Sequence, residues 1–281
     1  MQLLMTAGKL LLAIILLSLF SFYLAIRPFR IVSTMTPLDL GLQYEKVTFE
    51  TADKITLQAW YVPAKIATKK TIILLHGYPA DKGNILPVMH FLHSYYNLFL
   101  FDFRYFGESG GAYTTVGKDE VNDLLAAVQY LKNRNIHDIG VFGFSMGGAV
   151  AIMTASRTSD IKAVVADSSY ARLDWMVEDH YRLPILKEVM APLVRLWGWL
   201  FLGHDLKTVN PADALTKLHI PVLLIHSTDD NVIPQRHALL LQEKTAGNPR
   251  FKIISKQQLR HGEVGADYDK LILDFFRNAL P

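Results

Sequence analysis

A serine flanked by glycines is the residue of this chain best placed to act as a nucleophile. The segment Gly143-Phe144-Ser145-Met146-Gly147 follows a short apolar run of strand type, Ile139 to Phe142, and leads into an alanine-rich helical stretch, Ala149 to Ala155. A strand that enters a helix through Gly-x-Ser-x-Gly is a nucleophile elbow, in which the glycines allow a turn so tight that the serine backbone is strained. The sequence therefore predicts Ser145 as a catalytic nucleophile.

A serine hydroxyl is a poor nucleophile at neutral pH, so Ser145 needs a base and a group that orients the base. His261 is the candidate base, because it lies in a loop between the last predicted strand and the final predicted helix. Such a loop can reach the carboxyl edge of a parallel sheet, where ligands bind in open α/β sheets. Three aspartates compete for the orienting role: the neighbours Asp229 and Asp230 in the loop after another predicted strand, and Asp167 at a strand end.

An acyl-transfer site must also stabilise a developing oxyanion, which is worth about 3 to 4 kcal/mol per hydrogen-bond donor. The backbone amide of Met146 is one predicted donor, because it directly follows Ser145 at the start of a helix. The backbone amide of Tyr78 is the second, in the His-Gly-Tyr-Pro loop that follows a predicted strand. Gly77 allows the backbone to approach the substrate closely, and His76 is assigned a structural role beneath the loop.

The elements that must position these residues are predicted to form a sheet. Six apolar runs alternate with helical segments, which indicates a parallel sheet covered by helices on both faces. The runs are Thr71 to Leu75, Leu98 to Phe101, Ile139 to Phe142, Ala163 to Ala166, Val222 to Ile225 and Phe251 to Ile254, and the helices are Ile85 to Ser94, Lys118 to Asn133, the one after Ser145, Gln235 to Lys244 and Tyr268 to Asn278. Before them, Tyr44 to Phe49 and Ile55 to Val62 alternate polar and apolar residues and predict an antiparallel hairpin with one wet face.

One segment, residues 168–217, is far longer than a usual crossover between strands. Within it, Arg172 to Tyr181 and Ile185 to Leu202 are predicted to be helical, and several tryptophans make the segment strongly apolar. Two interpretations stay open: a helical excursion that packs its aromatic residues on the sheet, or a lid over the active site that also forms an acyl pocket. A third interpretation places Leu193 to Leu202 at a membrane interface.

The N-terminus predicts a membrane anchor. The apolar run from Leu10 to Ile26 has about 17 residues, the lower limit for a helix that spans a bilayer. A cleaved signal peptide is the competing interpretation, but no clear small-x-small cleavage site lies around Ser21 to Ala25. The side of the membrane that faces the domain is left open, because basic residues lie at both ends of the run. The expected organisation is a single-pass N-terminal transmembrane helix in residues 1–30, a linker in residues 31–41 and a globular domain in residues 42–281 with its insert at 168–217.

Composition excludes several classes of function. The length is within the range of one α/β domain with insertions, and the apolar fraction of 51% suggests contact with a membrane. A net charge of +3 does not indicate a basic surface for nucleic acid, and the lack of cysteine removes disulfides, thiol catalysis and cysteine-based zinc sites. No cofactor is expected, because no Gly-x-x-x-x-Gly-Lys-Ser/Thr occurs and the histidines are not paired at metal-ligand spacing.

Several of these motifs together resemble the α/β-hydrolase superfamily of serine hydrolases, in the branch often carried on an N-terminal membrane anchor. The matching pieces are HGYP at residues 76–79, DFRYFGESGG at 102–111, GFSMGG at 143–148, the loop of Asp230 and His261. The likeness covers Leu42 to the C-terminus. It implies a mostly parallel eight-stranded sheet with helices on both faces, a Ser-Asp-His triad on its loops and a lid after the sixth strand.

The resemblance also selects among the aspartates. The Asp-x-x-Ile-Pro turn that begins at Asp230 is similar to the acid loop of these enzymes, which leaves Asp229 as a turn or capping residue and Asp167 as the fallback. Two positions depart from the family pattern: Tyr105 stands where glycine is common, and Ser227 stands where His-Gly is usual. These departures concern the shape of loops and pocket, not the triad.

The predicted function is hydrolysis of a carboxylic ester or thioester through an acyl-Ser145 intermediate, with Asp230 and His261 completing the triad and Tyr78 and Met146 forming the oxyanion hole. The anchor and the apolar insert favour a small acyl or lipid-like substrate, and the oligomeric state is left open. A serine peptidase or amidase would use the same triad. A different class, a non-catalytic membrane-tethered binding module, is the remaining alternative.

Overall fold

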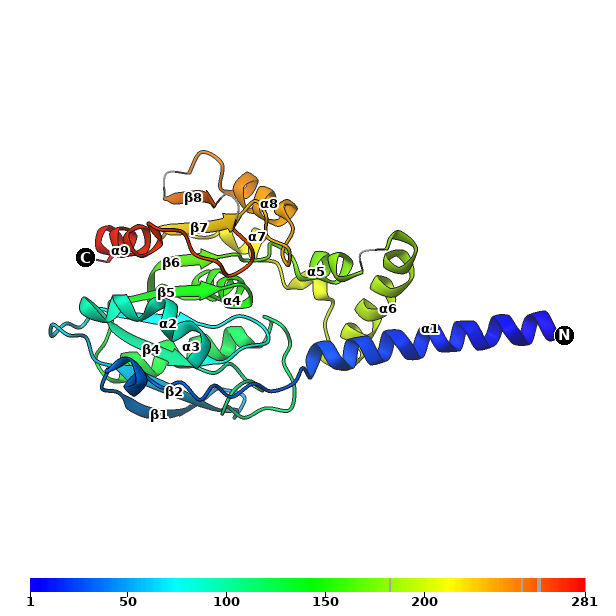
Figure 1. Cartoon of the computed structure of the whole chain (residues 1–281), viewed down its shortest axis with the longest axis horizontal. Coiled ribbons are helices and arrows are strands. Elements are labelled where there is room, and N and C mark those ends of the chain that lie inside the picture. The colour runs from blue at the N-terminus through cyan, green and yellow to red at the C-terminus, as the bar shows by residue number, and fades with distance from the viewer. Residues whose placement is uncertain (182, 249, 257–258, 281) are drawn as a thin grey trace.

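The structure is a computed structural model that describes residues 1–181, 183–248, 250–256 and 259–280. Its described residues form an eight-stranded sheet in the order β1-β2-β4-β3-β5-β6-β7-β8 (Figure 1). The strands are β1 Glu45–Glu50, β2 Thr56–Val62, β3 Thr71–Leu75, β4 Asn97–Phe101, β5 Ile139–Phe144, β6 Ile161–Asp167, β7 Val222–Ser227 and β8 Phe251–Lys256. Strands β1 and β2 pair antiparallel to each other, β2 pairs antiparallel to β4, and all later neighbours are parallel. The predicted hairpin and the mostly parallel eight-stranded sheet are confirmed.

Helices cover both faces of this sheet, as the apolar strands require. Every residue of β3 and β4 is buried, because these strands lie in the middle of the sheet with helices above and below. The helices are α1 Gln2–Ile26, α2 Lys82–Met89, α3 Glu120–Asn133, α4 Met146–Ala155, α5 Leu173–His180, α6 Pro184–Leu202, α7 Pro211–Leu215, α8 Gln235–Thr245 and α9 Tyr268–Ala279, with 3₁₀ turns at Pro37–Leu40, His90–Ser94 and Leu206–Thr208. Apolar residues of α3, α4, α7 and α8 form one core cluster, and those of α2 and α9 form the cluster on the opposite face.

Helix α2 begins three residues before the predicted start at Ile85. The side chain of Asp81 accepts hydrogen bonds from the amides of Gly83 at 3.1 Å and Asn84 at 3.2 Å, which caps the helix at that point. The helix then ends at Met89 and the chain continues as a 3₁₀ turn, so the predicted single helix is two shorter elements.

The insert at 168–217 is helical, with α5 and α6 at the two predicted positions. Figure 1 shows both helices beyond the edge of the sheet, with α6 beside the N-terminal helix α1. Phe22 of α1 is buried among Tyr181, Met190, Ala191 and Val194 of the insert. The role of the insert as a lid stays a prediction.

Helix α1 has 25 residues, and an 18-residue stretch of it has a mean hydropathy of 2.4 and few buried residues, so its length and composition would allow it to cross a membrane. Its N-terminal part projects away from the domain in Figure 1, and its C-terminal part contacts α6.

The segment assigned to the linker, residues 31–41, lies against the domain. The carboxylate of Asp81 accepts hydrogen bonds from the amide and the hydroxyl of Ser33, at 2.5 and 2.6 Å. A Cβ atom added to Gly83 would lie 2.6 Å from the Cβ atom of Ser33, so this close contact requires glycine there. The domain boundaries themselves stay predictions.

Helix α9 follows the loop of His261, and its packing gives a test of the fold. Phe276 is fully buried in the core, whereas its neighbour Phe275 is only partly buried. We expect Phe276→Ala to lower the free energy of unfolding of the detergent-solubilised protein by about 3 to 5 kcal/mol in urea titrations, because it leaves a core cavity. Phe275→Ala is the matched control and should lower it clearly less. Equal losses would contradict the assignment of this helix face to the core.

Candidate active site

Ser145 lies at a tight turn between β5 and α4. Its backbone has φ 53° and ψ −117°, a strained region for a residue other than glycine. The turn needs the flanking glycines, because a Cβ atom on Gly143 would lie 2.3 Å from the carbonyl oxygen of Gly147, and one on Gly147 would lie 2.7 Å from that of His76. The turn therefore has the geometry of a nucleophile elbow, and Ser145 is buried in it apart from 8% of its surface.

His261 and Asp230 meet at the same edge of the sheet. Nδ1 of His261 lies 2.7 Å from Oδ2 of Asp230, whose side chain is fully buried. The other carboxylate oxygen of Asp230 accepts hydrogen bonds from the amides of Val232 at 2.9 Å and Ile233 at 2.8 Å. Burial alone would raise the pKa of Asp230, but the hydrogen bonds from His261 and the two amides outweigh it and lower the pKa. Asp230 is therefore an ionised acceptor that can orient His261.

The fallback acid, Asp167, has another partner. Its Oδ2 accepts a hydrogen bond of 2.5 Å from the hydroxyl of Tyr268, and its Oδ1 accepts one of 3.2 Å from Ser168. Burial and the nearby carboxylate raise the pKa of Tyr268, so its hydroxyl stays a donor. Of the three competing aspartates, the structure joins Asp230 to His261.

The loop after β3 is shaped by the buried ring of His76. Nε2 of this ring accepts a hydrogen bond from the amide of Phe103 at 3.0 Å, so the proton is on Nδ1, which donates to the carbonyl of Gly77 at 2.8 Å. Burial lowers the pKa of His76 and favours this neutral form. Because the two ends of a planar trans peptide point in opposite directions, the bond to Gly77 turns the amide of Tyr78 away from the ring.

The two predicted oxyanion donors are free of other partners in the described part of the chain. Neither the amide of Tyr78 nor that of Met146 donates a hydrogen bond there. A Cβ atom on Gly77 would lie 3.2 Å from the Cβ atom of Ser145, so the loop and the elbow are in close contact. The amide of Met146 is at the first turn of α4, where the helix dipole favours negative charge.

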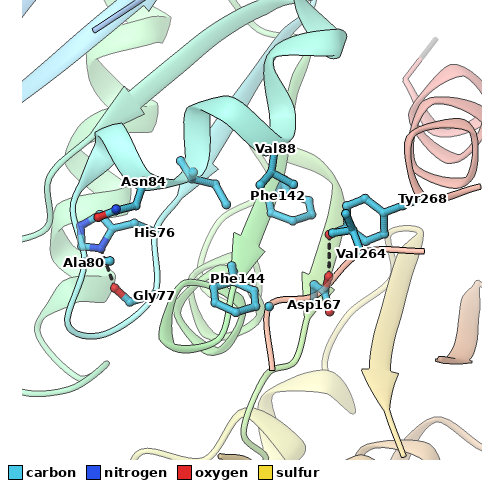
Figure 2. A pocket seen from close by; sticks show the side chains of 12 residues that line it. His76, Gly77, Ala80, Asn84, Val88, Phe142, Phe144, Asp167, Val264 and Tyr268 are labelled. Carbon is cyan, nitrogen blue, oxygen red and sulfur yellow. Dashed lines mark hydrogen bonds between the residues drawn. The ribbon is translucent and has the colours of Figure 1, made fainter. Parts of the chain in front are cut away.

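A cavity of about 150 Å³ lies beside this constellation. In Figure 2 the lining residue Phe144 lies between His76 and Gly77 on one side and the hydrogen-bonded pair Asp167 and Tyr268 on the other. The ring of Phe144 is 4.8 Å from that of His261, centroid to centroid. No hydrogen bond joins Ser145 to His261 in the described residues, although both lie next to Phe144.

Comparisons with known proteins agree with this geometry. A profile of the family described as alpha/beta hydrolase fold matches residues 70–197. The uncharacterized protein YqkD of Bacillus subtilis is 34% identical over 212 residues, which are 72% of this chain and 67% of that protein. The chain belongs to the α/β-hydrolase superfamily. Protein bem46 of Schizosaccharomyces pombe is 25% identical over 252 residues, 85% of this chain and 79% of that protein.

A solved structure gives this α/β hydrolase an enzymatic neighbour. The esterase Pf2001 of Pyrococcus furiosus is 29% identical, with a TM-score of 0.76 over 92% of this chain and 99% of the esterase. The superfamily and this likeness identify the protein as a hydrolase.

The predicted site residues of this α/β hydrolase thus lie on one edge of the sheet. The buried polar residues around Asp102 that hold the loop of His76 in place were not predicted from the sequence. Asp102 is fully buried and accepts hydrogen bonds from the amide of Lys82 at 2.8 Å and from its Nζ at 2.6 Å. A Cβ atom on Gly107 would lie 2.2 Å from this carboxylate, so the loop closes tightly around it. The amide that holds His76 belongs to the next residue, Phe103. The signal in the sequence that could have indicated this role of Asp102 is the run Asp-Phe-Arg directly after an apolar strand.

The two departures from the family pattern have structural roles. Tyr105 has φ 72°, the left-handed region in which glycine is favoured. Its hydroxyl donates a hydrogen bond of 2.6 Å to the carbonyl of Pro28, just beyond α1. Ser227 donates from its hydroxyl to the carbonyl of Leu259, which ties the loop of Asp230 to the loop of His261.

The lowered pKa of His76 predicts a pH dependence of stability. The unfolded chain takes up a proton on this histidine near pH 6.5, whereas the folded protein resists it. The contribution of His76 is therefore complete above about pH 6.5 and is lost as the pH falls below it, by up to about 1.4 kcal/mol per pH unit. We expect the free energy of unfolding to fall between pH 7.5 and 5.5 and His76→Gln to flatten this slope. The exposed His219, as His219→Gln, is the control that should leave the slope unchanged; an equal effect of both variants would refute the buried neutral state.

Proposed function

We propose that this α/β hydrolase is a serine hydrolase that cleaves a carboxylic ester or thioester of an acyl or lipid-like substrate. The observation that carries the proposal is the meeting of three features at one sheet edge: Ser145 in a strained elbow, the pair of His261 and Asp230, and the amides of Tyr78 and Met146, which have no partner among the described residues. These are the parts that acyl transfer requires: a nucleophile, an oriented base and an oxyanion site.

In the first step, Oγ of Ser145 attacks the carbonyl carbon while its proton passes to Nε2 of His261. Nδ1 of His261 faces Asp230, which holds the ring in the tautomer that leaves Nε2 able to accept. The negative charge on the carbonyl oxygen is stabilised by the amides of Tyr78 and Met146. The tetrahedral intermediate then collapses, the bond to the alcohol oxygen or thiol sulfur breaks, and the leaving group takes the proton from His261.

In the second step, water hydrolyses the acyl-serine. His261 accepts a proton from the water as its oxygen attacks the acyl carbon, and the same two amides stabilise the second oxyanion. Cleavage of the acyl bond returns the proton to Ser145 and releases the carboxylic acid. Within the part of the chain that the structure describes, Ser145 and His261 share no hydrogen bond, which fits this scheme because such bonds commonly tighten when substrate binds.

We further propose that α1 is an uncleaved membrane anchor rather than a removed signal peptide. Its buried Ser18 accepts a hydrogen bond of 3.0 Å from the indole nitrogen of Trp197, and its Phe22 packs in the apolar cluster of the insert. Removal of α1 would expose that apolar cluster, which is unfavourable, and would take away the partner of the indole nitrogen of the half-buried Trp197. The helix is thus part of the folded domain at one end and is long enough to span a bilayer.

A fluorophosphonate probe tests for an activated serine. We expect strong labelling of the detergent-solubilised wild type, none of Ser145→Ala, and labelling of His261→Ala that is about 10² to 10⁴-fold slower because the general base is lost. In-gel fluorescence with time gives the rates. Labelling of Ser145→Ala as strong as that of wild type would show that another residue is the nucleophile. A well-folded wild type that does not label would favour the non-catalytic binding module instead.

The two adjacent aspartates give a matched test of the orienting acid. Asp230→Asn should lower kcat for p-nitrophenyl acetate by about 10⁴-fold, because an amide at this position favours the wrong imidazole tautomer. Asp229→Asn changes an exposed neighbour in the same loop and should leave kcat unchanged. A large loss in Asp229→Asn with little loss in Asp230→Asn would overturn the assignment.

A further inference from the structure

A second cavity, of about 370 Å³, lies between α1, the loop of Tyr78 and the helices of the insert. It is much larger than the share of one water molecule in the liquid, about 30 Å³. Most of its lining is hydrocarbon, contributed among others by Leu24, Ile26, Leu173, Met176, Val177 and Val194. A concave, mostly apolar space of this size suits an apolar ligand such as an acyl chain.

One wall of this cavity comes from the last turns of α1. Residues 21, 22, 24, 25 and 26 all line it. The wall is fixed in place, because the hydroxyls of Ser21 and Tyr181 lie 2.6 Å apart and Phe22 is only 4% exposed. The N-terminal helix is therefore a structural part of the cavity and does not merely hold the domain near a membrane.

Tyr78 connects this cavity with the catalytic constellation. Its side chain lines the cavity, and its hydroxyl donates a hydrogen bond of 3.0 Å to the carbonyl of Ala25 near the end of α1. Burial raises the pKa of Tyr78 to about 12, which keeps this donor protonated. The backbone amide of the same residue is a predicted oxyanion donor. The cavity therefore adjoins the loop whose backbone carries this predicted donor, and Gly77 of the same loop lines the smaller cavity beside Ser145.

The outer side of α1 offers a route into the cavity. An open groove between α1 and α6 is lined by Leu16, Phe20 and Phe201, and it shares Phe22, Ile26 and Leu202 with the lining of the cavity. The faces around the groove are apolar and exposed on both helices, for example at Leu16 and Trp199, which are 56% and 59% exposed. Since α1 is long enough to span a bilayer, lipid is the environment that suits these exposed faces.

We propose that the cavity binds the acyl chain of a membrane-resident lipid ester, which enters from the bilayer through the groove, and that α1 forms part of the substrate site. This inference rests on the proposed function, because the bound ester carbonyl must be the one attacked by Ser145. It narrows the substrate class to long-chain esters presented by a membrane.

Acyl-chain preference in full-length protein, reconstituted in phosphatidylcholine vesicles, tests the proposal. The measurement is kcat/KM for p-nitrophenyl acetate, dodecanoate and hexadecanoate. Ala25→Trp fills the cavity from α1 and should lower the dodecanoate-to-acetate ratio by at least about tenfold, the effect expected when an apolar pocket loses space for methylene groups. Met176→Ala enlarges the cavity from α5 and should move the preference toward hexadecanoate. Leu12→Trp changes an exposed position of the same helix that is distant from the cavity lining and should leave the ratios unchanged.

The opposite directions of the two cavity variants exclude a merely structural effect, which would lower all rates together. Wild-type ratios in both Ala25→Trp and Met176→Ala would overturn the inference, while Ser145-dependent acetate hydrolysis would still support the proposed function. Equal changes in Ala25→Trp and Leu12→Trp would also overturn it.

A photoreactive diazirine fatty acid tests binding without catalysis. In vesicles that contain the Ser145→Ala protein, we expect cross-links to map to Met176 and Val177 inside the cavity and also to the exposed face of α1 around Leu12. Ala25→Trp should remove the first set and keep the second, which reports ordinary lipid contact. Cross-links on the exposed face alone would overturn the inference even if the enzyme hydrolyses short esters.

Discussion

The left-handed backbone of Ser145 is the constraint on which the rest of the site depends. A strained residue persists only where its surroundings fix it, and here β5 is paired on both sides, with β3 and β6. The amide of Ser145 also donates to the carbonyl of Asp167 on β6, at 2.8 Å. The position of the hydroxyl is therefore set by the middle of the sheet. The predicted site residues Tyr78, Asp230 and His261 lie in loops after β3, β7 and β8, which end at the same edge because these strands are parallel.

Three buried polar contacts, one after another, support the loop that carries Tyr78, the predicted oxyanion donor. The carboxylate of Asp102 holds Lys82, the adjacent amide of Phe103 holds His76, and His76 fixes the peptide that carries the amide of Tyr78. Burial lowers the pKa of Lys82, but the carboxylates of Asp102 and Glu108 outweigh it and raise the pKa. A buried charge pair of this kind adds little net stability, yet removal of one partner costs about 3 to 5 kcal/mol. Its effect is to give the loop one conformation, which an oxyanion site needs before the charge develops.

The sequence alone predicted the parts that have a local signature. Apolar runs of strand length identified the parallel strands, and the glycines around Ser145 identified the elbow, because both patterns follow from backbone geometry. The meeting of His261 with Asp230 required the order of the strands, which the family resemblance supplied. What could not be predicted was contact between distant segments of ordinary composition: Ser33 with Asp81, or Tyr105 with the carbonyl of Pro28. No sequence periodicity indicates which residues form such pairs, because the two residues come into contact only in the complete fold.

The contacts at the end of α1 explain why Tyr105 adopts a left-handed backbone conformation that favours glycine. The last carbonyls of a helix have no partners within the helix, and here the domain supplies them: Tyr78 bonds to Ala25, and the amide of Thr114 bonds to Ile26 at 2.9 Å. Tyr105 extends the series to Pro28, and its ring also lies 5.1 Å from the guanidinium of Arg30. Glycine at position 105 would relieve the backbone but would give up both interactions. The two interactions of Tyr105 therefore offset the strain of its backbone, and they fix the direction in which the chain leaves α1. If α1 spans a bilayer, this direction sets the orientation of the sheet edge relative to the bilayer.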